Sequence, residues 1–292
     1  MSESEPFRVA LASYGPDQFR LLHGVCEESG YVPVAYLSSR SLRPRGQSEP
    51  GDVESVARIV ESLPPGRDLL LPGTASGVAR ALTGYRPDLL VVFGFNWRLP
   101  REVLELPRLG ALNVHESALP RYRGPAPVLW AIRNGDPTFG VTVHRMDKGF
   151  DTGPVLAQRD DVPLPEDATP DTVWRQAAPA TSEVLRTALE KVAAGDPGTP
   201  QEEERASYAA FAPQKWQSID WSDVRYRIHH QLRVLRYMHG GTGPVVDLGG
   251  LRARVTATSL EPADGIRMSC GDGPLWITSW EPVADQTDRV TR

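Results

Sequence analysis

Residues 88–95, DLLVVFGF, include an unbroken apolar run from Leu89 to Phe93. A strand that is buried on both faces has this composition, whereas a strand with one solvent face alternates apolar and polar residues. Strands of the first kind occupy the middle of parallel sheets that helices cover on each side. The run therefore favours an α/β fold.

The chain before this run alternates short apolar segments with helical patterns. We expect strands at 7–15, 32–39 and 68–73, and helices at 16–29, 53–62 and 76–84. This order predicts a mostly parallel, Rossmann-like sheet with ligands at the carboxyl ends of its strands. The first loop, SYGPDQF, holds one glycine and the sequence has no GxxxxGK[ST] motif, so neither a dinucleotide site nor a triphosphate-binding loop is expected.

The sequence beyond the catalytic half predicts a domain boundary. A strand is expected at 154–164 and a helix at 170–194, which Pro179 should kink or divide. The composition then shifts to Gly, Pro and acidic residues. We therefore predict a catalytic domain over 1–194, a linker over 195–207 and a second domain over 208–292.

The second domain combines one helix with short strands. Ser222 or Asp223 is expected to cap a helix whose apolar stripe consists of Val224, Ile228, Leu232 and Leu235. Four arginines, Arg225, Arg227, Arg233 and Arg236, are expected on solvated faces of this helix. The remaining glycine-punctuated segments predict a small β-barrel-like domain.

Composition limits the classes of function. The 292 residues carry a formal net charge of −5, which gives no overall attraction to nucleic acid. The two cysteines, Cys26 and Cys270, have no metal-binding spacing, so no metal site and no disulfide framework are expected. The acidic N-terminus and the lack of a long apolar run predict a cytoplasmic protein without a membrane span.

The chemistry is concentrated in NVHESALPRYRG, residues 113–124, and in the later Asp151. Asn113 and His115 are two residues apart on an expected strand, so their side chains point to the same face. The Asn113 amide can donate to a carbonyl oxygen that becomes negative, His115 can hold a proton near neutral pH, and Asp151 could orient His115. Ser117 lacks the glycine-flanked turn of a hydrolase nucleophile, so the nucleophile is expected to arrive with the substrate as an amine.

These motifs resemble those of folate-dependent formyltransferases, the family that includes methionyl-tRNA, glycinamide ribonucleotide and sugar N-formyltransferases. The resemblance covers residues 87–160 and includes PDLLVVFGFNWRLP before the motif and HRMDKGFDTG after it. It implies the formyltransferase fold, 10-formyltetrahydrofolate as co-substrate and no metal. Asn113 and His115 would stabilise a tetrahedral intermediate, and Asp151 would assist His115 and proton transfer.

The resemblance also implies where the pterin ring of the folate binds. It points to two loops, one after the apolar strand and one before Asp151. The corresponding residues are Phe95, Asn96, Trp97, Arg98, Leu99, Leu104, Met146, Asp147 and Lys148. For the acceptor, Ser117, Arg121 and Arg123 are candidates, because two arginines in a loop beside the catalytic strand could hold an anionic group.

The identity of the acceptor is predicted from the C-terminal half. IDW and CGDG resemble parts of the C-terminal module of methionyl-tRNA and sugar formyltransferases. Residues 205–292 hold eleven Lys and Arg against nine Asp and Glu, a balance of only +2 for gripping tRNA phosphates. We therefore expect a small-molecule amine, an amino sugar or an amino-acid-derived amine, and keep methionyl-tRNA as the alternative.

Two other classes of function stay open. A 10-formyltetrahydrofolate hydrolase would share the catalytic residues and use water as the nucleophile, and such enzymes carry a regulatory domain ahead of the catalytic one. A non-catalytic folate-binding protein would keep the pterin loops without needing Asn113, His115 and Asp151 together. Formate and formylated amine as products distinguish hydrolysis from transfer.

Overall fold

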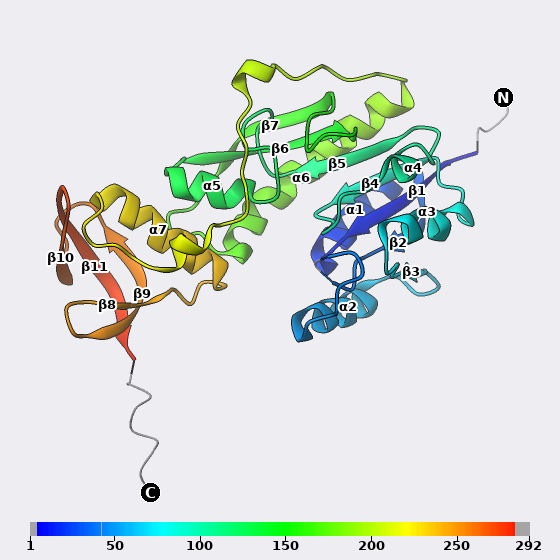
Figure 1. Cartoon of the computed structure of the whole chain (residues 1–292). Coiled ribbons are helices and arrows are strands. Elements are labelled where there is room, and N and C mark those ends of the chain that lie inside the picture. Colours follow the sequence, from blue (N-terminus) through cyan, green and yellow to red (C-terminus); the bar gives the residue numbers. More distant parts are fainter. Residues whose placement is uncertain (1–4, 42, 284–292) are drawn as a thin grey trace, which may run out of the picture. The chain divides into compact units, whose positions relative to one another are not determined.

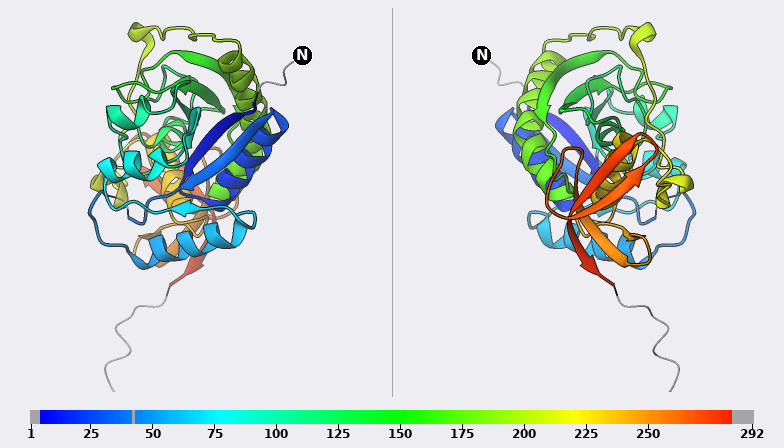
Figure 2. Two further views of the ribbon diagram at one scale, coloured as in Figure 1. Left: turned by 90° about the vertical axis from the view of Figure 1, so that its right-hand side faces the viewer. Right: turned by 90° about the vertical axis from the view of Figure 1, so that its left-hand side faces the viewer.

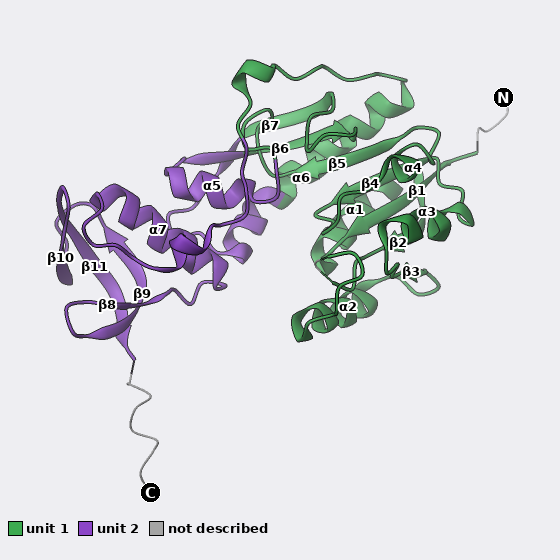
Figure 3. Ribbon diagram, in the orientation of Figure 1, with its two compact units in different colours: residues 1–123, 140–160, 178–207 green, residues 124–139, 161–177, 208–292 purple. Residues whose placement is uncertain are grey.

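The computed structural model describes residues 5–41 and 43–283. Its contacts divide the chain into two compact units (Figure 3). Unit 1 holds residues 1–123, 140–160 and 178–207, and unit 2 holds residues 124–139, 161–177 and 208–292. The chain therefore passes between the units several times, and the domain boundary expected at 195–207 stays a prediction.

A seven-stranded sheet with the order β3-β2-β1-β4-β5-β6-β7 dominates unit 1 (Figure 1). β1 to β5 pair with their neighbours in parallel, and β6 runs antiparallel to β5. The bounds of the strands are β1 Phe7–Ser13, β2 Tyr31–Leu37, β3 Leu69–Leu70, β4 Leu89–Phe93, β5 Ala111–His115, β6 Thr138–Arg145 and β7 Val155–Pro163. The mostly parallel α/β sheet predicted from the sequence is confirmed.

Helices cover this sheet on both faces (Figure 2). They are α1 Pro16–Glu28, α2 Pro50–Ser62, α3 Ala75–Thr83, α4 Arg101–Leu104 and α6 Pro170–Ala193. α3 and α4 pack with Ala10, Leu37, Leu90 and Val92 in one buried cluster. Since β-strand residues alternate between faces, the intervening buried residues of β1 and β4 face the opposite layer.

Local chemistry sets the start of α2, whereas a proline inside α6 does not end that helix. α2 begins earlier than expected, at Pro50, because Glu49 and Asp52 form a capping box and Pro50 occupies a first-turn position that suits proline. α6 continues through Pro179 as a single helix, so Pro179 does not divide it, and the other expected outcome, a kink, stays a prediction. No helix in the described ranges is long and apolar enough to cross a membrane.

Unit 2 contains α5 Pro127–Asn134, the 3-10 turn Gln214–Gln217, helix α7 Arg225–Met238 and a four-stranded antiparallel sheet. The sheet has the order β10-β11-β9-β8, with β8 Val245–Asp247, β9 Arg252–Ser259, β10 Ile266–Cys270 and β11 Gly273–Pro282. Ile228 and Leu232 of α7 pack with Val255 and Ile277 in its core. The expected small β-rich C-terminal module is confirmed as this curled sheet, drawn in orange and red in Figure 2.

Two details of α7 differ from the sequence-based expectation. Neither Ser222 nor Asp223 caps the helix, because the Asp272 carboxylate accepts the Arg225 backbone N–H at 2.6 Å instead. Arg233 is buried rather than solvated, with hydrogen bonds from its guanidinium to the carbonyl groups of Pro165 and Glu166 at 3.0 Å each. Asp272 and the 165–166 segment are distant in sequence from α7. A helical pattern of apolar residues cannot predict contacts with them.

The central position of β4 gives a testable consequence for stability. Leu90 is fully buried in the cluster beneath α3, whereas Leu71 is 40% exposed. We expect Leu90→Ala to lower the free energy of unfolding by about 2–5 kcal/mol, because it removes apolar contacts and leaves a cavity. Leu71→Ala serves as the control and should change it far less. Urea unfolding measures both free energies. Equal decreases in the two variants would contradict the placement of Leu90 in the buried layer beneath α3.

Candidate active site

The three residues predicted to be catalytic meet in unit 1. Asn113 and His115 stand on β5, and Asp151 lies in the turn between β6 and β7. Asn113 Nδ2 donates to Asp151 Oδ1 at 3.1 Å, and His115 Nδ1 lies 3.7 Å from Asp151 Oδ2. An amide, an imidazole and a carboxylate therefore lie together. The sequence predicted this, because Asn113 and His115 are two residues apart on one strand and Asp151 was expected to orient His115.

The backbone of the Asp151 turn is held by the Gln201 side chain and by its close packing against Arg145. Asp151 itself has φ 54°, a left-handed conformation that is uncommon for a residue with a side chain. Gln201 Nε2 donates to the carbonyl groups of Asp151 and Gly153, both at 2.8 Å. A Cβ on Gly153 would lie 1.8 Å from the Arg145 carbonyl oxygen, so only glycine fits there. The surroundings thus determine where the Asp151 carboxylate points.

Arg123 supports the turn through Gln201. Its Nε and Nη2 donate to Gln201 Oε1 at 3.1 and 3.0 Å, and its guanidinium binds both carboxylate oxygens of Glu203 at 2.8 and 2.9 Å. The Arg123 guanidinium lowers the pKa of Glu203. A buried chain of contacts therefore runs from Arg123 through Gln201 to the backbone of Asp151, and sequence reasoning did not find Gln201.

His115 is held mainly in its neutral form. Its Nε2 lies 2.8 Å from the Tyr122 carbonyl oxygen, which can only accept, so Nε2 carries a hydrogen and Nδ1 faces Asp151. Burial lowers the pKa of His115, and its neighbour His144 adds to the shift. The charge of Asp151 and the Tyr122 carbonyl oppose the shift without reversing it.

His144 is a second histidine of the cluster that sequence reasoning missed. It stands on β6 directly opposite Asn113, and its Nε2 lies 3.3 Å from Asn113 Nδ2 and 3.4 Å from Asp151 Oδ1. Its Nδ1 lies 2.9 Å from the Arg145 carbonyl, so Nδ1 carries the hydrogen and Nε2 accepts from Asn113. Directly opposed residues of an antiparallel pair share a face, and knowing that β6 pairs with β5 would have identified His144.

The residues predicted to bind the pterin lie on two loops of unit 1, except Leu104, which ends α4. Trp97 and Leu99 are 5% exposed, and Trp97 Nε1 donates to the Ser41 carbonyl at 2.9 Å. Leu104 is in the core cluster, with Phe95 and Met146 packed against it. Asn96 donates to Ser39 Oγ at 2.9 Å.

Arg98 joins these two loops. Its guanidinium donates to the Lys148 carbonyl and lies 5.1 Å from the centre of the Phe150 ring. The Asp147 carboxylate accepts from Gly149 N at 2.9 Å and from Thr152 Oγ1 at 2.7 Å, which shapes the second loop. Contact between these nine residues and folate stays a prediction.

The residues predicted to bind the acceptor shape the loop after β5. Ser117 is buried and its hydroxyl donates to the Arg121 carbonyl at 2.7 Å, and Arg121 donates to the Tyr122 hydroxyl at 3.0 Å. Arg123 binds Gln201 and Glu203. A direct role of these residues in acceptor binding stays a prediction.

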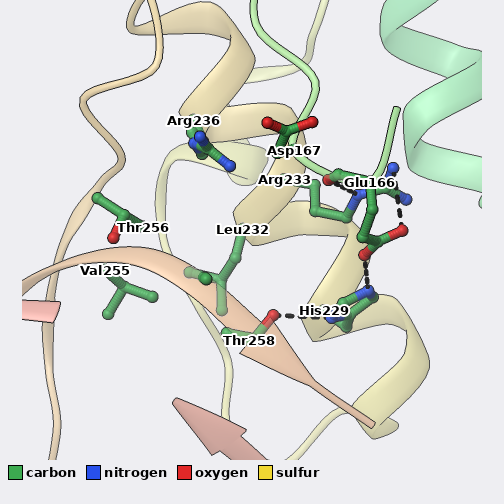
Figure 4. Close-up of a pocket in the computed structure, with 10 residues that line it drawn as sticks. Glu166, Asp167, His229, Leu232, Arg233, Arg236, Val255, Thr256 and Thr258 are labelled. Carbon is green, nitrogen blue, oxygen red and sulfur yellow. Dashed lines mark hydrogen bonds and ion pairs between the residues drawn. The ribbon is translucent and has the colours of Figure 1, made fainter. Parts of the chain in front are cut away.

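A separate cavity of about 190 Å³ lies in unit 2 (Figure 4). On its wall, Glu166 accepts from His229 Nε2 at 2.9 Å and pairs with Arg233 at 3.3 Å, and His229 Nδ1 lies 2.7 Å from Thr258 Oγ1. Glu166, His229 and Arg233 thus bind one another, and none of the lining residues belongs to the Asn113 cluster. Across residues 5–41 and 43–283, no group of three or more His, Cys, Asp or Glu could hold a metal ion.

The family model described as formyl transferase matches residues 9–189, which is more than half of the chain. The chain belongs to the formyltransferase family. It is 35% identical to a methionyl-tRNA formyltransferase of Roseiflexus castenholzii over 90% of this chain and 87% of that protein. It is 32% identical to a methionyl-tRNA formyltransferase of Ralstonia pickettii over 93% of this chain and 89% of that protein.

Solved structures share the fold of this formyltransferase. A 4-N formyltransferase from Francisella tularensis superposes with a TM-score of 0.67 at 16% identity, covering 89% of this chain and 100% of that one. HypX from Aquifex aeolicus in complex with tetrahydrofolic acid gives a TM-score of 0.62 at 20% identity, covering 96% of this chain and 45% of that one. Family membership confirms the predicted enzyme class, a formyltransferase that uses formyl-tetrahydrofolate.

The support that Gln201 gives to Asp151 can be tested. Gln201→Met keeps the side-chain length but removes both hydrogen bonds to the turn, so Asp151 should lose its fixed position. We expect kcat to fall about 10- to 100-fold, the range seen when outer partners of functional groups are lost. Gln217→Met, at an exposed amide, is the matched control. Unchanged formyl transfer by Gln201→Met would show that the turn does not need this anchor.

The pKa of His115 gives a second test. An NMR titration, with the signal assigned by its loss in His115→Gln, should give a midpoint below the ordinary value of about 6.5. Asp151→Asn should lower the midpoint further, because the carboxylate charge favours imidazolium. His115 binds a proton less readily in the folded chain than in the unfolded chain. The free energy of unfolding should therefore fall as the pH drops below about 6.5. A midpoint above the ordinary value would contradict the assignment.

Proposed function

We propose that the protein transfers the formyl group of 10-formyltetrahydrofolate to a primary amine of a small-molecule acceptor. The observation that carries the proposal is the meeting of Asn113, His115 and Asp151 in one buried cluster of unit 1. The cluster offers hydrogen-bond donors and a proton acceptor at the carboxyl end of β5, and no serine or cysteine nucleophile takes part in it. Positioning and electrostatic stabilisation supply the catalysis.

The formyl oxygen binds beside Asn113 and His115. Both hydrogens of the Asn113 amide are directed into the cluster, one to Asp151 and one to His144. An incoming carbonyl oxygen replaces one of these partners, so the amide is already oriented when the donor binds. The loops 95–99 and 146–148 hold the pterin ring.

The reaction then proceeds through a tetrahedral intermediate. The neutral amine attacks the formyl carbon, a C–N bond forms, and the carbonyl π electrons move to the oxygen. Asp151 accepts the proton of the attacking nitrogen and passes it to His115 Nδ1, which lies 3.7 Å from Asp151 Oδ2. The oxyanion then receives hydrogen bonds from Asn113 and from the His115 imidazolium. The bond between the formyl carbon and N10 then breaks, its electron pair stays on N10, and N10 takes up the proton that His115 received from the amine through Asp151. The products are a formamide and tetrahydrofolate.

The low pKa of His115 fits this sequence of steps. Burial keeps the free ring neutral. A negative oxygen formed next to the ring favours the imidazolium form, because an opposite charge within a few ångströms raises the pKa of a histidine. The positive charge on His115 thus develops together with the oxyanion that it stabilises.

Methionyl-tRNA is the second candidate acceptor. The specific observation that favours it is the 35% identity to a methionyl-tRNA formyltransferase over 90% of the chain. The small balance of basic over acidic residues in 205–292 favours a smaller acceptor, because binding a tRNA end relies on several phosphate contacts.

The central residue of the proposal is Asn113. We expect Asn113→Ala to lower kcat about 100- to 1000-fold, the cost of losing one oxyanion donor. Formylated product is measured by mass spectrometry, and circular dichroism checks that the fold persists. Gln217→Ala, which removes an exposed amide, should keep full activity. Normal formyl transfer by Asn113→Ala would reject the mechanism.

The acceptor class is decided in the same assay. Nucleotide-linked amino sugars, free amino acids and methionyl-tRNA are offered separately with 10-formyltetrahydrofolate. Product from methionyl-tRNA alone would reject the small-molecule acceptor. Release of formate at the same rate with and without every amine would instead support hydrolysis.

A further inference from the structure

Glu116 occupies the carboxyl edge of the sheet next to the catalytic cluster. Ser13, Phe93 and Val114 are aligned across β1, β4 and β5, so Tyr14, Gly94 and His115 follow at the strand ends and Glu116 is one residue further. These three strands are neighbours in the sheet, and β1 connects onward to β2 on one side while β4 lies on its other side (Figure 1). Ligands of open α/β sheets bind at this edge, where the strand order reverses.

The Glu116 carboxylate is half-buried and unpaired. Burial raises the pKa of its carboxyl group to about 7. Within the described part of the chain, no side chain or backbone group forms a hydrogen bond or ion pair with it. Among the described residues, the side-chain atoms that are fully buried without a partner belong to Ser29, Arg145 and Thr181, so the Glu116 carboxylate is open to solvent and to a ligand. A ligand group that donates a hydrogen bond or carries positive charge would stabilise the charged form of this carboxyl group.

The backbone on both sides of Glu116 is fixed. His115 binds the Tyr122 carbonyl at 2.8 Å, and Ser117 Oγ donates to the Arg121 carbonyl at 2.7 Å. Thr142 Oγ1 donates to the Ser117 carbonyl at 2.7 Å. Glu116 thus lies between two anchored residues, so its side chain starts from a defined position beside His115.

Tyr14 borders the same edge. Its ring covers Gly94, where an added Cβ would lie 2.2 Å from Tyr14 Cε1, and its carbonyl accepts from Ser55 Oγ at 2.9 Å. Loss of solvent around the hydroxyl and, after it, the negative charge of Glu116 raise the pKa of Tyr14 to about 12. Tyr14 is 46% exposed, and its hydroxyl stays neutral near pH 7, so it can itself donate or accept a hydrogen bond.

We propose that Glu116, with Tyr14 beside it, binds a second, positively charged amino group of the acceptor. The proposal rests on the proposed formyl transfer and narrows its acceptor to compounds with two amino groups. One amine is neutral and attacks the formyl carbon beside Asn113 and His115. The other stays protonated and pairs with Glu116, which repels phosphates and carboxylates at this position.

Binding at Glu116 is tested first without turnover. The protein is labelled with 13C at glutamate carboxyl carbons, and the Glu116 signal is identified by its loss in Glu116→Gln. We expect 1,4-diaminobutane to shift this signal saturably and 1,4-butanediol, which has the same length without charge, to leave it unchanged. Potassium chloride at equal ionic strength is the second control. No shift with the diamine, or the same shift with the diol or the salt, overturns the proposal.

Kinetics test the consequence for the acceptor. Ornithine and 5-aminopentanoate differ by the α-amino group, so they form a matched pair. We expect Glu116→Gln to raise KM for ornithine at least about tenfold with kcat little changed, as for the loss of a charged hydrogen bond, and to leave KM for 5-aminopentanoate unchanged. Glu105→Gln, at the exposed residue that follows α4, is the control variant and should alter neither constant.

The two proposals fail in different ways. An equal rise of KM for both amines in Glu116→Gln, or a fall of kcat alone, overturns the cation-binding role while formyl transfer stands. Absence of formylated product from every amine with the wild-type protein rejects the proposed function. The carboxyl signal of Glu116 still decides in that case whether the site binds a diamine.

Discussion

The active site depends on the position of β5 between a parallel and an antiparallel neighbour. Pairing with β4 places Asn113 and His115 at the carboxyl edge of a Rossmann-like sheet, and pairing with β6 places His144 opposite Asn113. The loop after β6 then folds back until Asp151 reaches both β5 side chains. A strand at the margin of the parallel part of the sheet therefore collects functional groups from both of its sides.

In the free protein this cluster places no positive charge beside the site where the formyl oxygen is proposed to bind. The buried His115 ring is neutral in the free protein, and the Asn113 amide is occupied by Asp151 and His144. In the mechanism that we propose, each of these groups gains a better partner when negative charge forms on the substrate. In the proposed mechanism, the site therefore stabilises the intermediate more than the unliganded state, which is the requirement for catalysis by differential binding.

Local patterns predicted the elements well, and they failed where a distant residue supplied the deciding contact. Apolar runs identified β1, β2 and β4, and the spacing of Asn113 and His115 placed both on one strand face. Asp272 as the cap of α7, Glu166 as the partner of Arg233, and Gln201 as the anchor of the Asp151 turn come from segments 47, 67 and 50 residues away. Periodicity shows which face of an element is buried, but it does not show which segment covers it.

The segment 201–207 follows the long helix α6, yet its side chains support the catalytic turn. Gln201 and Glu203 bind Arg123, and Ser207 exchanges hydrogen bonds with the backbone of Pro120, Tyr122 and Arg123. A stretch that resembles a connector by composition therefore supports the turn that carries Asp151. Replacement of the C-terminal module would preserve the Asp151 geometry only if the junction lay beyond Ser207, because the contacts that hold the turn extend to that residue.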